Sequence, residues 1–480
     1  MRSAPDSSGS YVPPPGSIPT LPVPDLANVR RVHMIGIGGA GMRNLARLLL
    51  ARGIAVTGSD LKAFNGLSEI REAGAHVAVG HEPEQLGRPD AVVISSAIPE
   101  HNVEVREARR RGLPVWVRAQ VLTAIARGKR LIAVAGTHGK TTTTSMLAVI
   151  LERSGLDSTY VVGGDLSEVG SGARAGAGDL FIAEADESDG SFLLMDPEIG
   201  VVTNVDVDHL DFYRGGREEI ESAFSAFQAK CGRLVSCADD PGARRALEVV
   251  PGRSVTYGTD PRSDVRLTVS SLGPDGARGS LRAESEKAEL RLSVDGSHNL
   301  LNAAAACSVA RMIGIPMGAA AEAVSAFGGV QRRFEYRGTV SGVDFYDDYG
   351  HLPTEVAVTL DVARRTEPRR LVAVFQPHRY SRTLALWREL GASLLGADLI
   401  VVTDVYGAEQ EPIPGVTGQL VVDGVQTADR DKHVVYLPSP AQAIEFLAEQ
   451  AREGDLVITL GCGDVWTIGD AALERIRETR

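Results

Sequence analysis

The stretch of the sequence best suited to chemistry is a glycine-rich loop at residues 134–145, VAGTHGKTTTTS. Its glycines leave backbone amides free to converge on phosphate oxygens, and Lys140 adds a positive charge. Thr141 opens a helix whose positive N-terminal end favours anions, and its hydroxyl suits Mg²⁺. The loop is two residues shorter than the common phosphate-binding loop. It predicts a site for a nucleoside triphosphate at Gly136, Thr137, His138, Gly139, Lys140, Thr141 and Thr142.

Two acidic clusters follow this loop, each at the end of a predicted strand. They are AEADESDGSF at residues 183–192 and TNVDVDHLDFY at residues 203–213. Neighbouring carboxylates repel one another unless a cation or a proton lies between them. Oxygen ligands with an imidazole suit Mg²⁺ or Mn²⁺ bound to nucleotide phosphates, so the clusters predict a metal site rather than two solvated loops.

An earlier glycine-rich loop follows the first predicted strand. Gly36, Gly38 and Gly41 form a GxGxxG pattern before a predicted helix, and Asp60 follows nineteen residues later. This pattern indicates a pyrophosphate held at a helix N-terminus. NAD and a UDP-sugar both carry a pyrophosphate, so the loop by itself leaves the two ligands open.

Further polar motifs stand at predicted strand or helix ends in the second half of the chain. DGSHNLLNA places Asn299 before a helix, where it either caps that helix or binds a ligand. Arginines at strand ends suit a carboxylate or phosphate ligand. The other candidates in such motifs are Arg333 in VQRRFEYRG, Asp348, Tyr349 and His351 in DDYGHLPTE, and His378, Arg379 and Arg382 in FQPHRYSRT.

The composition is that of an ordinary globular protein. A chain of 480 residues is too long to fold around one hydrophobic core, and its length indicates about three domains. The 62 acidic residues outnumber the 50 basic ones, which argues against a nucleic acid or a membrane surface as partner. Four cysteines without CxxC spacing indicate reduced core residues, and no apolar run reaches the length of a membrane span. Because the N-terminus lacks a signal pattern, we expect a cytoplasmic protein.

The order of predicted elements indicates α/β domains. Residues 1–27 are rich in Pro, Ser and Gly and have no periodic apolar face, which predicts a disordered tail. Three series of strands and helices follow and predict domains at residues 28–118, 119–329 and 330–480. In the second series, residues 254–295 alternate apolar and polar, which predicts antiparallel strands inserted in or appended to the α/β core.

Taken in order, these motifs resemble those of the Mur ligases. The matching stretches extend from about residue 30 to the end of the chain, and include HMIGIGGAGM, SSAIPEHN, AGTHGKTTTTSML, EADESDGSFL, TNVDVDHLDFY, DDYGHLPTEV and VFQPHRYSRT. The resemblance is greatest to those members that join L-alanine to UDP-N-acetylmuramate. It implies a Rossmann-like N-terminal domain for the UDP-sugar, a central P-loop ATPase domain, and a Rossmann-like α/β C-terminal domain for the amino acid and substrate.

The resemblance implies an ATP-dependent ligase of peptidoglycan precursor synthesis that uses Mg²⁺ or Mn²⁺. In such an enzyme the lactyl carboxylate of UDP-N-acetylmuramate attacks the γ-phosphate of ATP, and the amine of L-alanine then attacks the resulting acyl phosphate. These two small molecules are the expected partners, and a monomer or weak homodimer is the expected state.

The resemblance also implies roles for individual residues. Lys140, Glu184 and His209 are the implied catalytic residues, and Thr141, Glu184 and His209 are the implied metal ligands. Asn299, Arg333 and Asp348 join the residues of the ATP-binding loop. The implied substrate-binding residues are Gly38, Gly39, Ala40, Gly41, Asp60, Ser96, Tyr349, His351, His378, Arg379 and Arg382.

The sequence departs from the family pattern at several positions, which leaves alternatives open. Arg43 and Asn44 replace the usual Ser-Gly, Leu352 replaces a histidine, and Cys462 stands in GCGD where GAGD is usual. These changes bear on substrate preference more than on the chemistry. The alternatives are a sister ligase that adds a preformed peptide, an NAD-dependent oxidoreductase that uses the first glycine loop, and a catalytically silent nucleotide-binding regulator.

Overall fold

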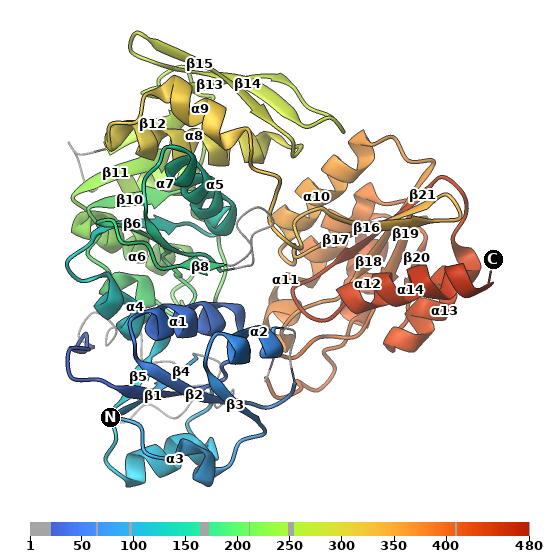
Figure 1. Ribbon diagram of the computed structural model, residues 1–480. Coiled ribbons are helices and arrows are strands. Elements are labelled where there is room, and N and C mark those ends of the chain that lie inside the picture. Colours follow the sequence, from blue (N-terminus) through green and yellow to red (C-terminus); the bar gives the residue numbers. More distant parts are fainter. Residues whose placement is uncertain are drawn as a thin grey trace. The chain divides into compact units, whose positions relative to one another are not determined.

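The computed structural model describes residues 21–63, 66–95, 98–163, 172–210, 212–247, 254–408 and 410–479. These residues form three sheets covered by helices, which is the three-domain α/β architecture that the sequence predicts (Figure 1). The first two sheets belong to one compact unit that ends at Gly328, and the third belongs to a second unit that begins at Gly329.

The N-terminal domain is a five-stranded parallel sheet in the order β3-β2-β1-β4-β5. The strand order reverses between β1 and β4, and ligands of such sheets bind beyond the carboxyl ends of the strands at this point. The first glycine-rich loop lies there, between β1 and α1. The elements are β1 (Arg31–Ile35), α1 (Ala40–Ala51), β2 (Ala55–Asp60), α2 (Leu67–Glu72), β3 (His76–Val79), β4 (Ala91–Ile94), α3 (Val103–Arg110), β5 (Val115–Val117) and α4 (Arg118–Ala126).

The central domain is built on a ten-stranded sheet in the order β15-β14-β13-β12-β11-β10-β6-β9-β7-β8. Strand β6 leads into the second glycine-rich loop, and its parallel neighbours β9 and β10 lead into the two acidic clusters. The loop and both clusters therefore meet at one edge of the sheet. The elements are β6 (Arg130–Ala135), α5 (Lys140–Arg153), β7 (Thr159–Val161), β8 (Ala173–Arg174), β9 (Leu180–Glu184), β10 (Ile199–Val202), α6 (Arg217–Lys230), β11 (Arg233–Cys237), α7 (Pro241–Leu247), β12 (Ser254–Gly258), β13 (Val265–Ser271), β14 (Ala277–Ala283), β15 (Glu286–Leu292), α8 (Ser297–Met312) and α9 (Met317–Val324).

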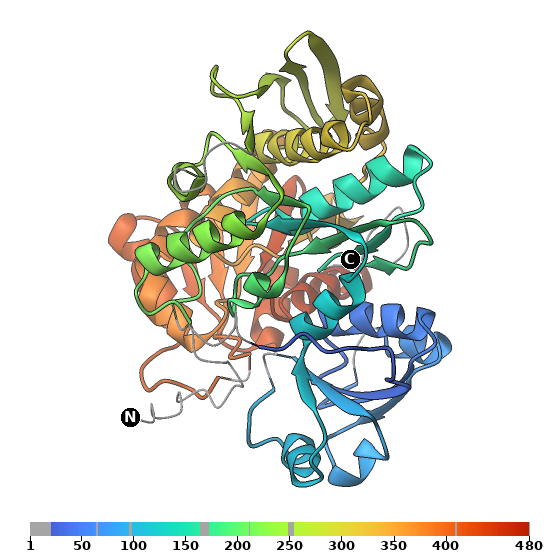
Figure 2. The ribbon, with the colours of Figure 1, turned by 90° about the vertical axis from the view of Figure 1, so that its left-hand side faces the viewer.

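The antiparallel region expected at residues 254–295 is smaller than the sequence pattern predicts. β12 pairs in parallel with both β11 and β13, so it continues the parallel sheet. The strands β13, β14 and β15 pair antiparallel and extend the same sheet beside α8 and α9 (Figure 2). Alternation reports which face of a strand is buried, and it does not tell how the strand pairs with its neighbours.

The C-terminal domain is a six-stranded sheet in the order β16-β17-β21-β18-β19-β20. β16 is antiparallel to β17, and the other neighbouring strands are parallel. The carboxyl ends of β17, β18 and β21 therefore lie at one edge. The elements are β16 (Glu335–Val340), β17 (Val343–Asp348), α10 (Pro353–Arg365), β18 (Arg370–Phe375), α11 (Tyr380–Ser393), β19 (Leu399–Val402), α12 (Gln419–Ala428), β20 (Val434–Tyr436), α13 (Pro440–Gln450), β21 (Asp455–Leu460) and α14 (Trp466–Thr479).

The N-terminal and central domains share a hydrophobic core. One cluster of buried residues includes Met42 and Leu45 of α1 together with Val161 of β7 and Ala173 of β8. The helix that follows the first glycine loop therefore packs directly on the central domain.

The prediction of a disordered tail at residues 1–27 is wrong for residues 21–27, which are ordered within the first unit, and residues 1–20 lie outside the described residues. Arg127 donates hydrogen bonds to the carbonyl oxygens of Val23 (2.9 Å) and Pro24 (3.2 Å). Gln120 donates to the carbonyl oxygen of Pro22 at 2.7 Å. Side chains distant in the sequence therefore order this proline-rich segment, although it has no periodic pattern of its own.

The four cysteines form no disulfide, as the sequence predicts. Cys231, Cys237 and Cys307 are buried, and Cys462 is half-buried. Of the helices in the described ranges, none is both long and apolar enough to cross a membrane.

Glu104 is a buried carboxylate near the start of α3 with several hydrogen-bond partners. Its Oε2 accepts from Ser59 Oγ at 2.5 Å and lies 3.3 Å from His81 Nδ1 and 3.7 Å from His33 Nε2. Burial acts to raise the pKa of Glu104, but hydrogen bonds from His33, His81 and Ser59 outweigh it and lower the pKa to about 2. The ionised carboxylate therefore stabilises the fold above its ordinary pKa of 4.5, and this contribution is lost as the pH falls from 4.5 towards 2.

We expect Glu104→Gln to lower the free energy of unfolding by about 2 kcal/mol at neutral pH, because buried hydrogen bonds to a charged group are lost. Urea denaturation at neutral pH and at about pH 3 measures the effect, and the difference from the wild type shrinks at the lower pH. Glu107→Gln, on the same helix, is the control because Glu107 pairs with Arg110 and Arg111 at the surface. Equal losses in the two variants would contradict the prediction.

Candidate active site

The second glycine-rich loop joins β6 to α5 in a conformation that requires glycine. Gly139 has a φ of 80° and immediately precedes α5. Gly136 has a φ of 137°, and a Cβ at this position would collide with Thr203 Oγ1. Glycine tolerates both constraints, and the loop amides consequently lie at the N-terminus of a helix, where anions bind.

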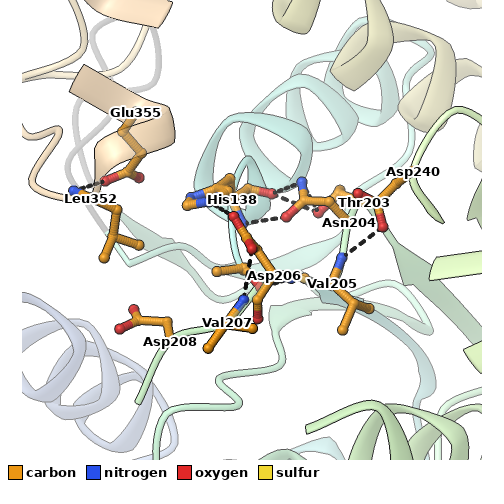
Figure 3. A network of polar contacts seen from close by, with 12 residues as sticks. His138, Thr203, Asn204, Val205, Asp206, Val207, Asp208, Asp240, Leu352 and Glu355 are labelled. Atoms are coloured by element: carbon orange, nitrogen blue, oxygen red, sulfur yellow. Dashed lines mark hydrogen bonds and ion pairs between the residues drawn. The ribbon is translucent and has the colours of Figure 1, made fainter. Parts of the chain in front are cut away.

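The residues that follow β10 hold the loop in place (Figure 3). The amide of His138 donates to Asn204 Oδ1 at 2.8 Å, and Asn204 Nδ2 donates to the carbonyl oxygen of His138 at 2.9 Å. The amide of Asp206 donates to Thr137 Oγ1 at 2.9 Å, and that of Val205 donates to Asp240 Oδ1 at 3.0 Å. The second acidic cluster therefore supports the shape of the phosphate-binding loop.

Lys140 forms a buried ion pair with Glu187. Lys140 Nζ lies 2.8 Å from Glu187 Oε2 and donates to the carbonyl oxygen of Gly136 at 2.6 Å. Burial acts to lower the pKa of Lys140, but the negative charges of Glu187 and Asp186 outweigh it and raise the pKa. Lys140 therefore keeps its charge within the loop. Glu187, which is 2% exposed, belongs to the first acidic cluster, but the sequence did not indicate that it pairs with Lys140.

Glu184 lies at the end of β9, next to the glycine loop. It forms a hydrogen bond with Thr141, and its Oε1 accepts from the amide of Gly163 at 2.6 Å. Burial is the largest influence on Glu184 and raises the pKa of its carboxyl group. Two of the three predicted metal ligands, Thr141 and Glu184, are thus in direct contact.

Asp186 connects the acidic cluster to His209 and to the N-terminal domain. Burial acts to raise the pKa of Asp186, but the charges of Arg118, Lys140 and His209 outweigh it and lower the pKa to about 2. His209 Nε2 also lies 3.1 Å from Asp208 Oδ2. The charges of the predicted catalytic residues Lys140 and His209 therefore both lower the pKa of the same carboxylate, that of Asp186.

The donor set fits a metal ion that is also bound by nucleotide phosphates. Among the described residues, no group of three or more His, Cys, Asp and Glu side chains is placed to hold a metal by itself. Thr141 and Glu184 nevertheless supply adjacent oxygen donors, which Mg²⁺ and Mn²⁺ prefer. A cation beside Glu184 would also offset the burial that raises the pKa of its carboxyl group.

The first glycine loop forms a second cradle at the N-terminus of α1. The amide of Gly38 donates to Asp60 Oδ2 at 2.7 Å, and Arg43 Nη1 donates to the carbonyl oxygen of Gly38 at 2.9 Å. Gly39 caps α1, which begins at Ala40. The predicted substrate residues Gly38, Gly39, Ala40, Gly41 and Asp60 thus lie together, whereas Ser96 lies outside the described residues.

Arg118 lies between the two cradles and was not singled out from the sequence. Its Nη2 is 3.1 Å from Asp186 Oδ2. A Cβ added to Gly41, in the first glycine loop, would lie 3.1 Å from Arg118 Nη1. The guanidinium of Arg118 therefore pairs with the acidic cluster of the central domain and lies beside Gly41 of the N-terminal domain.

Helix α8 brings Asn302, which was not singled out from the sequence, to the second glycine loop. Asn299 Nδ2 makes a local contact to the carbonyl oxygen of Asp295 at 2.7 Å. Asn302, one turn later, accepts from Thr143 Oγ1 at 3.3 Å, and a Cβ on Gly139 would lie 2.6 Å from Asn302 Oδ1. The i,i+3 spacing places both asparagines on one helix face, and this spacing could have indicated Asn302.

In the second unit, Asp348 lies at the carboxyl end of β17. Its carboxylate accepts the amides of Phe334 (2.8 Å) and Gly350 (2.7 Å). Burial raises the pKa of Asp348, although the charge of Arg333 acts in the opposite direction. Arg333 also lies near Glu355, with Nη1 at 3.5 Å from Oε1. Asp348 and Arg333, both predicted to bind nucleotide, are therefore electrostatic partners.

A second polar group in this unit surrounds His378. Its ring lies 5.6 Å from that of His351 and stacks on Tyr406 at 5.8 Å. Arg382 Nη1 lies 3.0 Å from His378 Nδ1, and the Tyr349 ring lies 5.8 Å from that of His351. Four of the predicted substrate residues thus cluster, and Tyr406 joins them without having been singled out.

Two arginines of this unit have positive φ values, and their contacts differ. Arg332 (58°) directs its guanidinium to Asp347 at 2.8 Å and to the carbonyl oxygen of Gly461 at 2.7 Å, which joins β17 to the end of β21. Arg379 (66°) caps α11, and its amide donates to the carbonyl oxygen of Tyr406 at 2.8 Å. Arg332 is therefore a structural residue, and Arg379 lies at the predicted substrate group.

Three family profiles cover most of the sequence. They are the Mur ligase family catalytic domain at residues 31–130, the Mur ligase middle domain at residues 134–310, and the Mur ligase glutamate ligase domain at residues 332–463. The chain belongs to the Mur ligase family. This confirms the resemblance drawn from the motifs.

Relatives of this Mur ligase match it over nearly its whole length. The UDP-N-acetylmuramate–L-alanine ligase of Rubrobacter xylanophilus is 47% identical, over 93% of this chain and 100% of the relative. The enzyme of the same name from Pelotomaculum thermopropionicum is 43% identical, over 94% and 98%. The solved UDP-N-acetylmuramate–alanine ligase of Thermotoga maritima has a TM-score of 0.81 at 26% identity, over 94% and 100%. The solved murein peptide ligase of Psychrobacter arcticus has a TM-score of 0.74 at 25% identity, over 93% and 98%.

Proposed function

We propose that this Mur ligase uses ATP to join L-alanine to the lactyl carboxylate of UDP-N-acetylmuramate, in the synthesis of peptidoglycan precursors. The observation that carries the proposal is the pair of anion cradles in the first unit, at Gly38–Gly41 and at Gly136–Thr142, with Arg118 between them. One cradle suits a pyrophosphate and the other a triphosphate. Relatives named for this reaction support the choice of substrates.

The reaction couples amide formation to phosphoryl transfer. A carboxylate oxygen of UDP-N-acetylmuramate bonds to the γ-phosphorus of ATP while the bond from that phosphorus to the bridging oxygen breaks, and ADP leaves. The nitrogen of L-alanine then attacks the acyl carbon and loses a proton, and inorganic phosphate leaves. The protein forms no covalent bond to either substrate, so it acts by positioning and by neutralising charge.

The residues of the first unit have distinct parts in this chemistry. Lys140 exchanges its partner Glu187 for the β- and γ-phosphate oxygens, and the loop amides orient the triphosphate. Thr141, Glu184 and His209 would hold Mg²⁺, which supplies positive charge to the phosphate oxygens. Asp60 holds the amide of Gly38, and it thereby fixes the loop that receives the UDP moiety.

We assign recognition of the lactyl group and of the amino acid to the second unit. Its cluster of His378, Arg382 and Tyr349 carries the cationic and aromatic groups that suit a carboxylate, and His351 and Arg379 lie at the same cluster. We assign nucleotide binding to Asn299 in the first unit, and to Arg333 and Asp348 in the second. The chain acts as a monomer or weak homodimer.

The alternative functions receive less support. A ligase that adds a preformed peptide shares the chemistry, but the solved murein peptide ligase has the lower TM-score, 0.74 against 0.81. An NAD-dependent oxidoreductase would leave Lys140 and both acidic clusters without a function. A silent regulator would not need Lys140, Glu184 and His209, all of which are present.

The proposal is tested by measuring phosphate release from ATP with Mg²⁺, UDP-N-acetylmuramate and single amino acids. We expect release with L-alanine, and at least about tenfold less with other amino acids or with the peptide L-alanyl-D-glutamate. Preference for the peptide would favour the sister ligase. Binding of NADH, followed by fluorescence, with no release of phosphate would favour the oxidoreductase.

A further inference from the structure

A single peptide bond connects the helix of the first glycine loop to Glu184. Asn44 lies in the first turns of α1 and is 1% exposed, and its Nδ2 donates to the carbonyl oxygen of Val162 at 2.8 Å. The amide of Gly163 donates to Glu184 Oε1 at 2.6 Å. The carbonyl group of Val162 and the amide of Gly163 belong to the same peptide bond, which is planar and rigid.

The strand register explains why this peptide reaches Glu184. β7 is parallel to β9 with Val161 opposite Ala183, so the peptide that follows β7 lies beside the last residue of β9. The Glu184 carboxylate approaches the backbone closely here, since a Cβ on Gly163 would lie 2.7 Å from Glu184 Oε2. The contact is therefore built into the end of the sheet.

Asn44 is a costly residue at its position. Its Oδ1 is buried and has no hydrogen-bond partner among the described residues. A buried polar atom without a partner destabilises a fold, and an apolar side chain would avoid this. The hydrogen bond that Asn44 does make is to the carbonyl oxygen of Val162. A hydrogen bond to the carbonyl oxygen of a peptide group also makes the N–H of that peptide a stronger donor. Here the strengthened donor is the amide of Gly163, which binds Glu184.

We propose that Asn44 is a positioning residue that couples the sugar-nucleotide loop to the carboxylate of Glu184. This rests on the proposed function, which assigns the N-terminus of α1 to UDP-N-acetylmuramate and Glu184 to the metal and ATP. A shift of α1 on binding of the pyrophosphate moves Asn44, and the rigid Val162–Gly163 peptide carries the movement to Glu184. Each substrate then changes the affinity for the other by the same factor.

The resemblance to the Mur ligases implies a glycine at the position where this chain has Asn44. Glycine has no side chain that could reach Val162. The first glycine loop and Glu184 would then communicate only through the shared hydrophobic core of α1, β7 and β8.

The test measures binding of Mn²⁺ with a non-hydrolysable ATP analogue to the full-length chain, by calorimetry, with and without UDP-N-acetylmuramate. In the wild type we expect the sugar nucleotide to tighten binding of the analogue about fivefold or more. Asn44→Leu keeps the branched shape of the side chain but removes the donor, and we expect it to reduce this factor to about one. Asn44→Gly removes the same donor, and it replaces Asn44→Leu in this measurement, with the same expected factor, if the leucine variant does not fold.

Leu45→Ala is the matched control, because Leu45 is a buried core residue of the same helix that makes no bond to the peptide. It lowers thermal stability and keeps the wild-type coupling factor. If Asn44 had only a structural role, Asn44→Leu would also lower thermal stability and keep the coupling factor of the wild type. That result in Asn44→Leu overturns the inference. So does a factor of one in a wild type that binds both ligands. A wild type that binds neither ligand overturns the proposed function instead.

Discussion

Lys140→Ala is expected to reduce kcat about 10³-fold or more, measured as phosphate release with both substrates present. Negative charge spreads over the γ-phosphate oxygens as the bond to ADP breaks, and Lys140 is the cation of the glycine loop that receives them. Alanine leaves the backbone amides of the loop unchanged. The loss therefore falls mainly on kcat, and the KM for L-alanine changes little.

The same substitution also affects stability, because Lys140 is the partner of a buried carboxylate. Removal of its ammonium group leaves Glu187, which is 2% exposed, without the contact at 2.8 Å, and we expect a loss of about 3 kcal/mol. The double variant Lys140→Ala/Glu187→Gln should recover most of this stability, since a neutral amide needs no opposing charge. Turnover should stay lost in the double variant. Wild-type turnover there would remove Lys140 from the mechanism.

The strands and glycine loops were predictable from the sequence because local rules determine them. β1 ends just before the glycine loop that begins with Gly36, and β6 ends just before the loop that begins with Gly136, as the two motifs predict. Gly136 and Gly139 adopt positive φ values, which is the reason why a strand–loop–helix connection of this kind needs glycine at both positions.

Contacts between distant parts of the sequence were not predictable in the same way. Lys140 and Glu187 are 47 residues apart, Arg118 and Asp186 are 68 apart, and Thr143 and Asn302 are 159 apart. These pairs depend on the strand order β10-β6-β9-β7, which hydrophobic periodicity does not contain. The motifs therefore indicated which segments do chemistry, but not which side chains neutralise or position one another.

Glu184→Gln is expected to reduce kcat about 10²-fold or more and to raise the Mg²⁺ concentration needed for half-maximal turnover. Glutamine still offers an acceptor to the amide of Gly163, so the hydrogen bond at 2.6 Å and the local fold are kept. The negative charge beside Thr141 is lost, and the metal that neutralises the phosphate oxygens binds more weakly. Initial rates over a series of Mg²⁺ concentrations measure both effects.

Glu198→Gln is the matched control for this prediction. Glu198 precedes β10 and pairs with Arg130 and Arg233 at the amino ends of β6 and β11, whereas Glu184 lies at the carboxyl end of β9. Both variants remove one carboxylate from the same sheet, and we expect Glu198→Gln to leave the Mg²⁺ dependence unchanged. If Glu184→Gln also kept the wild-type Mg²⁺ dependence, Glu184 would not be a metal ligand, because a carboxylate that only supports the fold does not set the metal requirement.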